Sequence, residues 1–151
     1  MFVGYYKSPI GLLEVTCSEN SVLSILFVGE AISNFNENPL VKESINQLDQ
    51  YFKGERKDFS LTLTINGTTF QNQVWQELRK IPFGTTVSYK ELAMRIGNEK
   101  AVRAVGNANG KNLISIIVPC HRVIGSDKSL TGYAGGLNRK QWLLEHEVKT
   151  K

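Results

Sequence analysis

The first 66 residues combine two hydrophobic periods, one typical of strands and one typical of a helix. Alternating apolar residues predict strands over residues 13–18 and 59–65, and the apolar run 22–28 predicts another. From Pro39 to Phe52 apolar residues recur at helical spacing, and Gly54 suits the end of that helix. We therefore expect a small sheet with one helix, in which no catalytic motif is recognisable.

After Gly67 the pattern changes to helices. Thr69 is the predicted N-cap of the first, Ser88 and Glu91 form a capping box at the second, which ends at Gly97, and Asn138 is the predicted cap of the last. The spacing predicts helices over residues 69–81, 88–96, 99–109 and 138–147.

The second and third of these helices form a predicted helix-turn-helix, a motif whose second helix enters a DNA groove. That helix has a face of small residues and offers only Lys100 and Arg103 as long side chains. This is too few for a code of base contacts, but it lets the backbone approach a partner closely. A purely structural helix pair would show the same pattern, since small residues also serve tight packing.

Charge favours the DNA-binding interpretation. The chain has 151 residues, of which 41% are hydrophobic and 21% charged, and its net charge is +4. Residues 79–122 hold eight basic and two acidic residues, a net charge of +6, so the remainder carries −2. A basic segment in an otherwise slightly acidic protein indicates a polyanionic partner, most simply nucleic acid. A solvated lysine-rich face is the alternative that charge alone leaves open.

Length and composition narrow the class of protein. The chain is long enough for one ordinary domain or two small ones. It has no apolar stretch of membrane-spanning length, and its start has no basic region followed by an apolar one. We therefore expect a cytoplasmic protein without a membrane partner, in which Cys17 and Cys120 are free thiols.

Candidate chemistry is concentrated in the apolar stretch 116–124. Pro119 sets a rigid approach to Cys120, and His121 follows directly. A cysteine beside basic groups is a candidate nucleophile, because the thiolate is the reactive form. Adjacent side chains of an extended segment point to opposite faces, so the thiol and the imidazole need a bridging water or a local turn to act together. A buried core cysteine is the alternative, and Cys17 is interpreted in that way.

The remaining motifs exclude more than they predict. The glycine-containing stretch 130–136 lacks the lysine and hydroxyl of a phosphate-binding loop, so we expect no nucleotide cofactor. Tyr133, an aromatic residue among small ones, suits the wall of a pocket; a flexible loop is the alternative. The histidines and cysteines are too scattered for a metal site, so we expect no metal. Trp142 is interpreted as a core residue.

The stretch Pro119-Cys120-His121-Arg122-Val123-Ile124 is similar to the active-site signature of the O6-alkylguanine-DNA alkyltransferases. The resemblance covers nearly all of the chain after Gly67, and it is weak before that point, at residues 8–13 and 51–54. Its other parts, in the order and spacing of that family, are Phe83-Gly84, residues 88–93, residues 101–106, Asn112, residues 133–137 and residues 142–147.

The resemblance implies an α+β fold in two domains. Residues 1–66 would form a small N-terminal domain with an antiparallel sheet and a helix. Residues 67–151 would form a mostly helical, winged-helix-like domain that holds the helix-turn-helix and the alkyl acceptor. We expect a monomer.

The resemblance also implies roles for single residues. Cys120 would accept the alkyl group, and His121 would deprotonate it through a water while Glu147 orients the imidazole. Asn112 would tie the helix-turn-helix to the active-site segment by hydrogen bonds. Tyr89 would crowd the phosphate beside the target and donate a proton or hydrogen bond to the departing guanine.

The implied partner is double-stranded DNA with O6-alkylguanine, bound from the minor groove with the target nucleotide flipped out. Arg103 would fill the gap left in the base stack. The other implied DNA-binding residues are Ala101, Gly106 and Ser126, and the alkyl pocket would be lined by Tyr133, Ala134 and Gly135. The reaction would be a single-turnover repair of O6-alkylguanine, with O4-alkylthymine as a second candidate substrate.

Two departures from the family pattern are visible. The zinc ligands that some members carry in the N-terminal domain are not evident, and Ala134 stands where some members have a serine, which leaves the substrate range open. The cysteine that non-repairing relatives have replaced is present, so we expect activity. Two other classes compete with this interpretation: a protein that only binds alkylated DNA, and a Cys-His hydrolase in which Glu147 orients the histidine.

Overall fold

The structure, a computed structural model, describes residues 1–31 and 36–151. It divides into two compact units. Unit 1 comprises residues 1–65 and 113–115, and unit 2 comprises residues 66–112 and 116–151. The fold is α+β, with an antiparallel sheet in unit 1 and most of the helices in unit 2, so the predicted fold class is confirmed.

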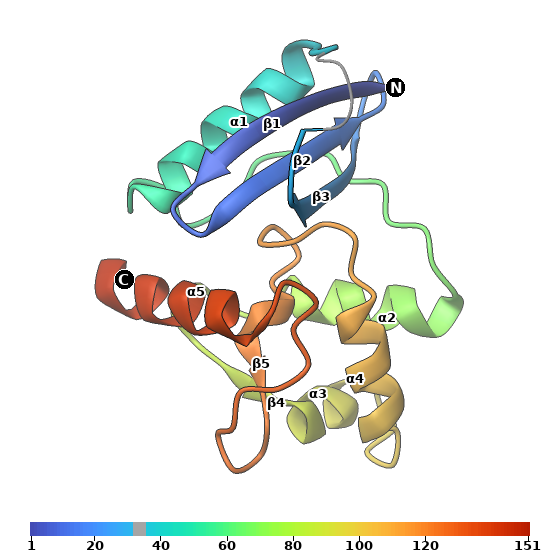
Figure 1. The fold of residues 1–151 in the computed structure, drawn as a ribbon. Coiled ribbons are helices and arrows are strands. Elements are labelled where there is room, and N and C mark those ends of the chain that lie inside the picture. The colour runs from blue at the N-terminus through green and yellow to red at the C-terminus, as the bar shows by residue number, and fades with distance from the viewer. Residues whose placement is uncertain (32–35) are drawn as a thin grey trace. The chain divides into compact units, whose positions relative to one another are not determined.

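Unit 1 is a three-stranded antiparallel sheet packed against one helix (Figure 1). The strands β1 (Phe2–Ser8), β2 (Gly11–Cys17) and β3 (Val22–Val28) lie in that order, and α1 (Pro39–Phe52) packs on them. The alternation of β2 turns Leu13, Val15 and Cys17 into the core, and none of the three is exposed to solvent. Thus the predicted strands at 13–18 and 22–28 are confirmed.

The helix α1 begins and ends as its sequence indicates. Asn38 is the N-cap, and its side-chain oxygen accepts a hydrogen bond of 2.8 Å from the N–H of Val41. Pro39 occupies the first turn, where its missing N–H costs nothing. Gly54 follows the C-cap with φ of +78°, a conformation that favours glycine.

The strand predicted over residues 59–65 is wrong, and β1 was missed. Residues 59–65 pair with β3 only at one position, where the N–H of Val22 donates to the carbonyl of Thr62 and the N–H of Thr64 donates to that of Val22. The same edge of β3 also pairs at Ile25 with residues 113–115. Two short segments therefore share an edge that the alternation had assigned to one strand.

Unit 2 contains four α-helices and a parallel pair of two-residue strands. The elements are α2 (Thr69–Leu78), β4 (Val87–Ser88), α3 (Tyr89–Arg95), α4 (Val102–Gly110), the 3₁₀ turn η1 (Cys120–Arg122), β5 (Val123–Ile124) and α5 (Leu137–Thr150). Helices α2, α3 and α4 contact one another, and the indole N–H of Trp75 donates to the carbonyl of Ala108 at 2.8 Å. This cluster is the predicted helix-turn-helix with α2 as its support.

Three helices start at other residues than predicted. Thr68, not Thr69, is the N-cap of α2, in a reciprocal capping box with Gln71. Gly136, with φ of +96°, precedes α5 in place of the predicted Asn138. Helix α4 starts at Val102 rather than at residue 99.

Half of the predicted capping box of α3 is confirmed, since the Ser88 hydroxyl accepts from the N–H of Glu91 at 2.9 Å, but the Glu91 side chain does not reach back to the N–H of Ser88. The carboxylate of Glu91 is hydrogen-bonded to Arg95 at 3.0 Å, one turn further along the helix. None of the helices in the described ranges is long and apolar enough to cross a membrane.

Candidate active site

Cys120, His121 and Arg122 form a single turn of 3₁₀ helix, not an extended segment. Pro119 precedes it with φ of −82° and ψ of 64°, and the N–H of Arg122 donates to the Pro119 carbonyl at 3.0 Å. All three side chains of the turn are buried, and His121 is entirely enclosed. The turn removes the geometric objection that an extended chain would raise, because successive side chains no longer alternate between two faces.

Two asparagines hold the cysteine, Asn109 in the last turn of α4 and Asn112 just after that helix. The side-chain N–H₂ of Asn112 donates to the Val118 carbonyl at 2.9 Å and to Sγ of Cys120 at 3.3 Å. The amide of Asn109 donates to the carbonyl of Cys120 at 3.2 Å. Asn112 thus links the segment that follows α4 to the segment that carries the thiol.

The surroundings of Cys120 favour the protonated thiol over the thiolate. Burial raises the pKa of Cys120, while the hydrogen bond from Asn112 and the positive charge of Lys140 oppose this in part. A thiol with a raised pKa needs a base before it can act as a nucleophile, and the same Asn112 bond would stabilise the thiolate once it forms.

Glu147 of α5 contacts both His121 and Arg122. Its Oε2 lies 2.6 Å from Nε2 of His121, and Arg122 contacts the same carboxylate through Nε at 2.8 Å and Nη2 at 3.0 Å. Burial raises the pKa of Glu147, but the hydrogen bonds and charges of His121 and Arg122 outweigh this and lower it well below its ordinary range. The carboxylate is therefore ionised and can only accept hydrogen bonds.

This geometry selects one tautomer of His121. Because Glu147 accepts, the ring proton lies on Nε2 and Nδ1 carries the lone pair. Burial lowers the pKa of His121, although Glu147 opposes the shift, so the ring is neutral near pH 7. Nδ1 is buried and has no hydrogen-bond partner within residues 1–31 and 36–151. A neutral ring with a free lone pair is the form that can accept a proton.

Tyr89 and Lys140 meet at one carbonyl beside this cluster. The oxygen of Thr131 accepts from the Tyr89 hydroxyl at 2.8 Å and from Nζ of Lys140 at 2.7 Å. Nζ also donates to the carbonyl of Val123 and lies 5.7 Å from the centre of the Tyr89 ring. Burial lowers the pKa of Lys140 to about 8 and raises that of Tyr89. The stretch that carries the predicted pocket is thus held at both the helix-turn-helix and α5.

Cys120, His121, Arg122, Asn112 and Glu147 are called the thiol cluster below. Only part of the predicted pocket adjoins it. Tyr133 is buried, and its ring stands edge-on to His121 with the centroids 6.5 Å apart. Ala134 is exposed, and Gly135 is half-buried with its carbonyl accepting from Arg139 at 3.0 Å.

The predicted DNA-binding residues lie mostly at the surface of unit 2. Arg103 is exposed in the first turn of α4, and Ala101 is the N-cap of that helix. A Cβ at Gly106 would meet the Tyr89 ring at 3.9 Å, so this glycine lies beside the tyrosine. Ser126 is exposed in the turn after β5. The structure does not bring Arg103 or Ser126 into hydrogen-bonding contact with the thiol cluster.

Three site residues escaped the sequence analysis as functional groups: Arg122, Lys140 and Asn109. A signal for one of them was present, because Lys140 and Glu147 are seven residues apart and so share a helix face with Leu143. The side chains of Lys140, Leu143 and Glu147 are all fully buried. A lysine and a glutamate on the apolar stripe of an amphipathic helix indicate a built polar site, since such groups are rarely buried unpaired. Trp142 lies on another face of α5, where it is half-buried and stacked on His146 at 4.8 Å, so its interpretation as core is wrong.

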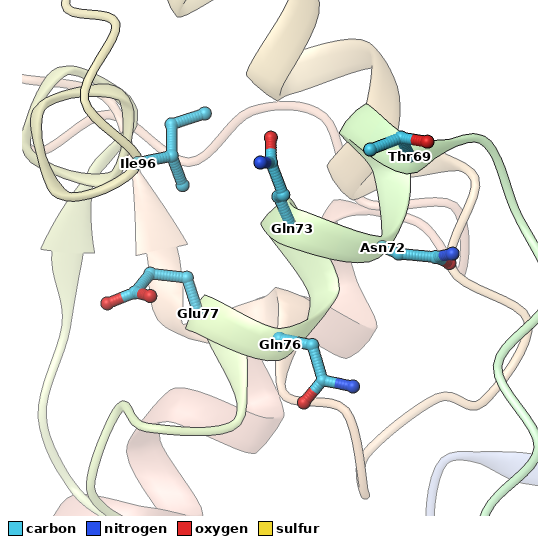
Figure 2. Close-up of a pocket in the computed structure, with 6 residues that line it drawn as sticks. All are labelled: Thr69, Asn72, Gln73, Gln76, Glu77 and Ile96. Carbon is cyan, nitrogen blue, oxygen red and sulfur yellow. The ribbon is translucent and has the colours of Figure 1, made fainter.

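A separate hollow of about 490 Å³ lies on the outer side of α2. It is lined by Thr69, Asn72, Gln73, Gln76, Glu77 and Ile96, and Figure 2 shows Gln73 and Glu77 projecting from α2 on the side of Ile96. No predicted site residue lines it. Within the described part of the chain, no group of three His, Cys, Asp or Glu side chains could hold a metal ion.

Comparison with known proteins places this geometry in a family. The profile described as 6-O-methylguanine DNA methyltransferase, ribonuclease-like domain, matches residues 1–65, and the profile of the DNA binding domain of the same family matches residues 69–149. Methylated-DNA–protein-cysteine methyltransferase of Methanosarcina acetivorans is 44% identical, over 97% of this chain and 98% of its own length. The protein of that name from Mycobacterium leprae is 47% identical, over 95% and 92%.

Solved structures agree. The crystal structure of Mycobacterium tuberculosis OGT in complex with DNA is 42% identical, covers 99% of this chain and 94% of its own, and superposes with a TM-score of 0.91. With both profiles matched along the chain, and with the cysteine, histidine and glutamate assembled in one buried cluster, the chain belongs to the 6-O-methylguanine DNA methyltransferase family.

Proposed function

We propose that this protein repairs DNA by transferring the alkyl group of O6-alkylguanine to Sγ of Cys120, once per molecule. Its relatives carry the name methylated-DNA–protein-cysteine methyltransferase, and the Mycobacterium tuberculosis structure holds DNA. The observation that carries the proposal is the buried thiol that accepts a hydrogen bond from Asn112, next in the chain to a neutral, oriented imidazole.

The proton of the thiol leaves first. A water between Sγ and Nδ1 of His121 would carry it to the ring, whose Nε2–H stays bonded to Glu147. The resulting imidazolium is stabilised by the carboxylate 2.6 Å away. The thiolate is held by the Asn112 amide and by the charge of Lys140.

Alkyl transfer then exchanges one bond for another. The thiolate attacks the alkyl carbon, the S–C bond forms as the C–O6 bond breaks, and the electron pair of that bond passes to the guanine. Protonation of the guanine ring completes the balance. We assign Tyr89 as the donor to the departing base, which requires its hydroxyl to exchange the Thr131 carbonyl for the guanine. The product is a thioether that no group of the site can cleave, so the protein acts once.

DNA would be bound by the helix-turn-helix from the minor groove. Arg103 is exposed at the start of α4, and the neighbouring Ala101 and Gly106 let the helix backbone approach closely. The lesion oxygen lies inside the duplex, so the nucleotide must be flipped, at a cost of about a few kcal/mol. Arg103 in the vacated stack would offset part of that cost, and Ser126 in the turn after β5 would contact the backbone of the DNA.

The remaining assignments follow from the same reaction. We propose that Tyr133, Ala134 and Gly135 line the alkyl pocket, that residues 67–151 form the domain that binds DNA and accepts the alkyl group, and that residues 1–66 form a separate N-terminal domain. The protein would act as a monomer in the cytoplasm, where both cysteines stay reduced; neither forms a disulfide here.

Intact mass spectrometry tests the proposal. After incubation with an oligonucleotide duplex that carries O6-methylguanine, the protein should gain the mass of one methylene group, and peptide mapping should place it on Cys120. Cys120→Ser should gain nothing, and Cys17→Ala should react like the unaltered protein.

The same experiment separates the competing classes. Tight binding to the lesion without any mass gain would identify a protein that only recognises alkylated DNA. Turnover of an ester substrate without a stable adduct would identify a hydrolase.

A further inference from the structure

Arg122 is the buried charged residue that the reaction above does not use. It is 7% exposed, lies in the same 3₁₀ turn as Cys120 and His121, and its side chain donates three hydrogen bonds. Nε and Nη2 contact both oxygens of Glu147, and Nη1 donates to the carbonyl of Ile81 at 2.7 Å. The guanidinium carbon also lies 5.7 Å from the centre of the Phe83 ring.

The carboxylate is therefore shared between two partners of unequal charge. Oε2 accepts from His121 and from Arg122, while Oε1 accepts from Arg122 and, at 3.2 Å, from the N–H of Gly84. A bidentate guanidinium is the strongest charge partner that a protein offers a carboxylate. Arg122 brings a permanent positive charge to the Glu147 carboxylate, whereas His121 contributes only a neutral N–H.

We propose that Arg122 is a positioning residue that neutralises Glu147, so that the carboxylate orients His121 without holding a second proton on its ring. A carboxylate with no other partner, buried 2.6 Å from an imidazole, draws a proton onto the ring and forms an ion pair. An imidazole that is already protonated cannot accept the proton of Cys120. Arg122 prevents this, because its own charge already balances that of Glu147.

The charged and titratable groups around His121 are consistent with these roles of Glu147 and Arg122. Glu147 faces the ring from α5 and favours its protonation, whereas Arg122 in the turn and Lys140 of α5 oppose it. The Tyr133 ring faces it edge-on, and Cys120 precedes it in the chain. Removal of Arg122 leaves Glu147 as the dominant neighbour, with Lys140 as the remaining opposing charge.

This inference rests on the proposed function only for its kinetic consequence. Its first test needs no substrate: nitrogen-15 NMR of the histidine rings as a function of pH, with His146→Gln to assign the two histidines. In the unaltered protein the His121 ring should be neutral and protonated on Nε2 at pH 7. In Arg122→Gln the second proton should bind at higher pH, and in the matched control Arg56→Gln, which alters an arginine of unit 1, the titration should not move.

The second test is the pH dependence of alkyl transfer from free O6-benzylguanine, which needs no DNA. The acid limb of the rate profile should move to higher pH in Arg122→Gln, and the rate should recover toward that of the unaltered protein at alkaline pH. A shift of one pKa unit lowers the neutral fraction of the ring about tenfold on the acid side. A merely structural role would instead slow transfer by the same factor at every pH.

Arg122→Lys keeps the proposal testable if Arg122→Gln does not fold. An ammonium keeps the charge but cannot contact both oxygens as a fork, so the His121 ring should protonate at a pH between those of the unaltered protein and Arg122→Gln. An unchanged ring titration in the variants that fold would overturn the proposal. Absence of alkyl transfer in the unaltered protein would overturn the proposed function instead, and the NMR titration would still decide the role of Arg122.

Discussion

The two cysteines lie in regions that differ less in burial than in polar surroundings. Cys17 is enclosed in the sheet of unit 1, and Cys120 is 4% exposed in the turn η1 of unit 2. Burial raises the pKa of both thiols. Ser44 is the side chain that opposes the shift at Cys17, whereas Asn112 and Lys140 do so at Cys120, with a neutral histidine next in the chain. A low resting pKa is therefore not what distinguishes the proposed nucleophile; the adjacent imidazole of His121 and the positive charge of Lys140 are.

The largest expected effect comes from exchanging the thiols themselves. Cys120→Ser should abolish transfer from both duplex O6-methylguanine and free O6-benzylguanine, since a hydroxyl is a far weaker nucleophile near neutral pH. Cys17→Ala should keep the rate of the unaltered protein. Single-turnover rates on both substrates decide this, and a loss of activity in Cys17→Ala that is not explained by unfolding would contradict the comparison.

Glu147→Gln should produce the next largest effect, because it removes the partner of both His121 and Arg122. A general base contributes about 10²–10⁴-fold to a rate, so we expect transfer to slow by at least about 10²-fold. Leaving Arg122 buried without its carboxylate should lower the free energy of unfolding by about 3–5 kcal/mol. Urea unfolding and single-turnover rates measure the two effects, with Glu145→Gln, an exposed position of the same helix, as the control.

Arg103→Ala should affect only reactions that open a base stack. The variant should repair duplex O6-methylguanine at least about tenfold more slowly, because part of the cost of flipping, about a few kcal/mol, is no longer offset. Its rate with free O6-benzylguanine should stay near that of the unaltered protein. Lys100→Ala controls for charge, since it removes an exposed cation one turn earlier in the chain. Equal slowing of Arg103→Ala on both substrates would mean that the arginine is structural or catalytic.

Stability should fall as the pH drops below the ordinary pKa of histidine, about 6.5. The pKa of His121 is lowered in the fold, so below that pH the unfolded chain binds a proton that the folded ring does not. The free energy of unfolding then falls by up to about 1.4 kcal/mol per pH unit until the ring also protonates. The Glu147 carboxylate, with its pKa far below the usual range, adds to this loss only in stronger acid. Urea unfolding from pH 7 to pH 5 should show a flatter dependence in His121→Gln; an unchanged slope would show that the ring is not buried neutral.

The smallest expected effect concerns the pocket. Ala134 is exposed, so Ala134→Ser should change the free energy of unfolding by no more than about 0.5 kcal/mol. The added hydroxyl should alter rates with methyl and benzyl substrates by about a few-fold, the scale of one hydrogen bond. With alanine and two glycines in the stretch 134–136, we expect benzyl as well as methyl groups to be accepted. Absence of an adduct with free O6-benzylguanine, where methylated DNA reacts fully, would contradict this.

Local rules predicted well wherever the contacts that matter are near in sequence. The Ser88 cap reaches three residues, and the Gly54 and Gly97 ends depend on a single backbone conformation, with φ of +78° and +81°. Residues 59–65 failed the same rules, because alternation shows which side chains face the core and says nothing about which strand edge is available. That edge of β3 is shared with residues 113–115, about fifty residues later in the chain.

By itself the sequence determined the α+β class, the strands β2 and β3, the helices, and the family, and it proposed Cys120 as the alkyl acceptor through a motif that is contiguous in the chain. Only the tertiary structure decided which distant groups contact that motif. Glu147 lies 25 and 26 residues from its partners Arg122 and His121, and Lys140 reaches a carbonyl 17 residues away. Hydrogen bonds between such distant groups leave no period in the sequence. The packing of α5 against η1 sets the tautomer of His121, the burial of Lys140 and the contact of Arg122 with Glu147. None of these follows from a residue taken alone.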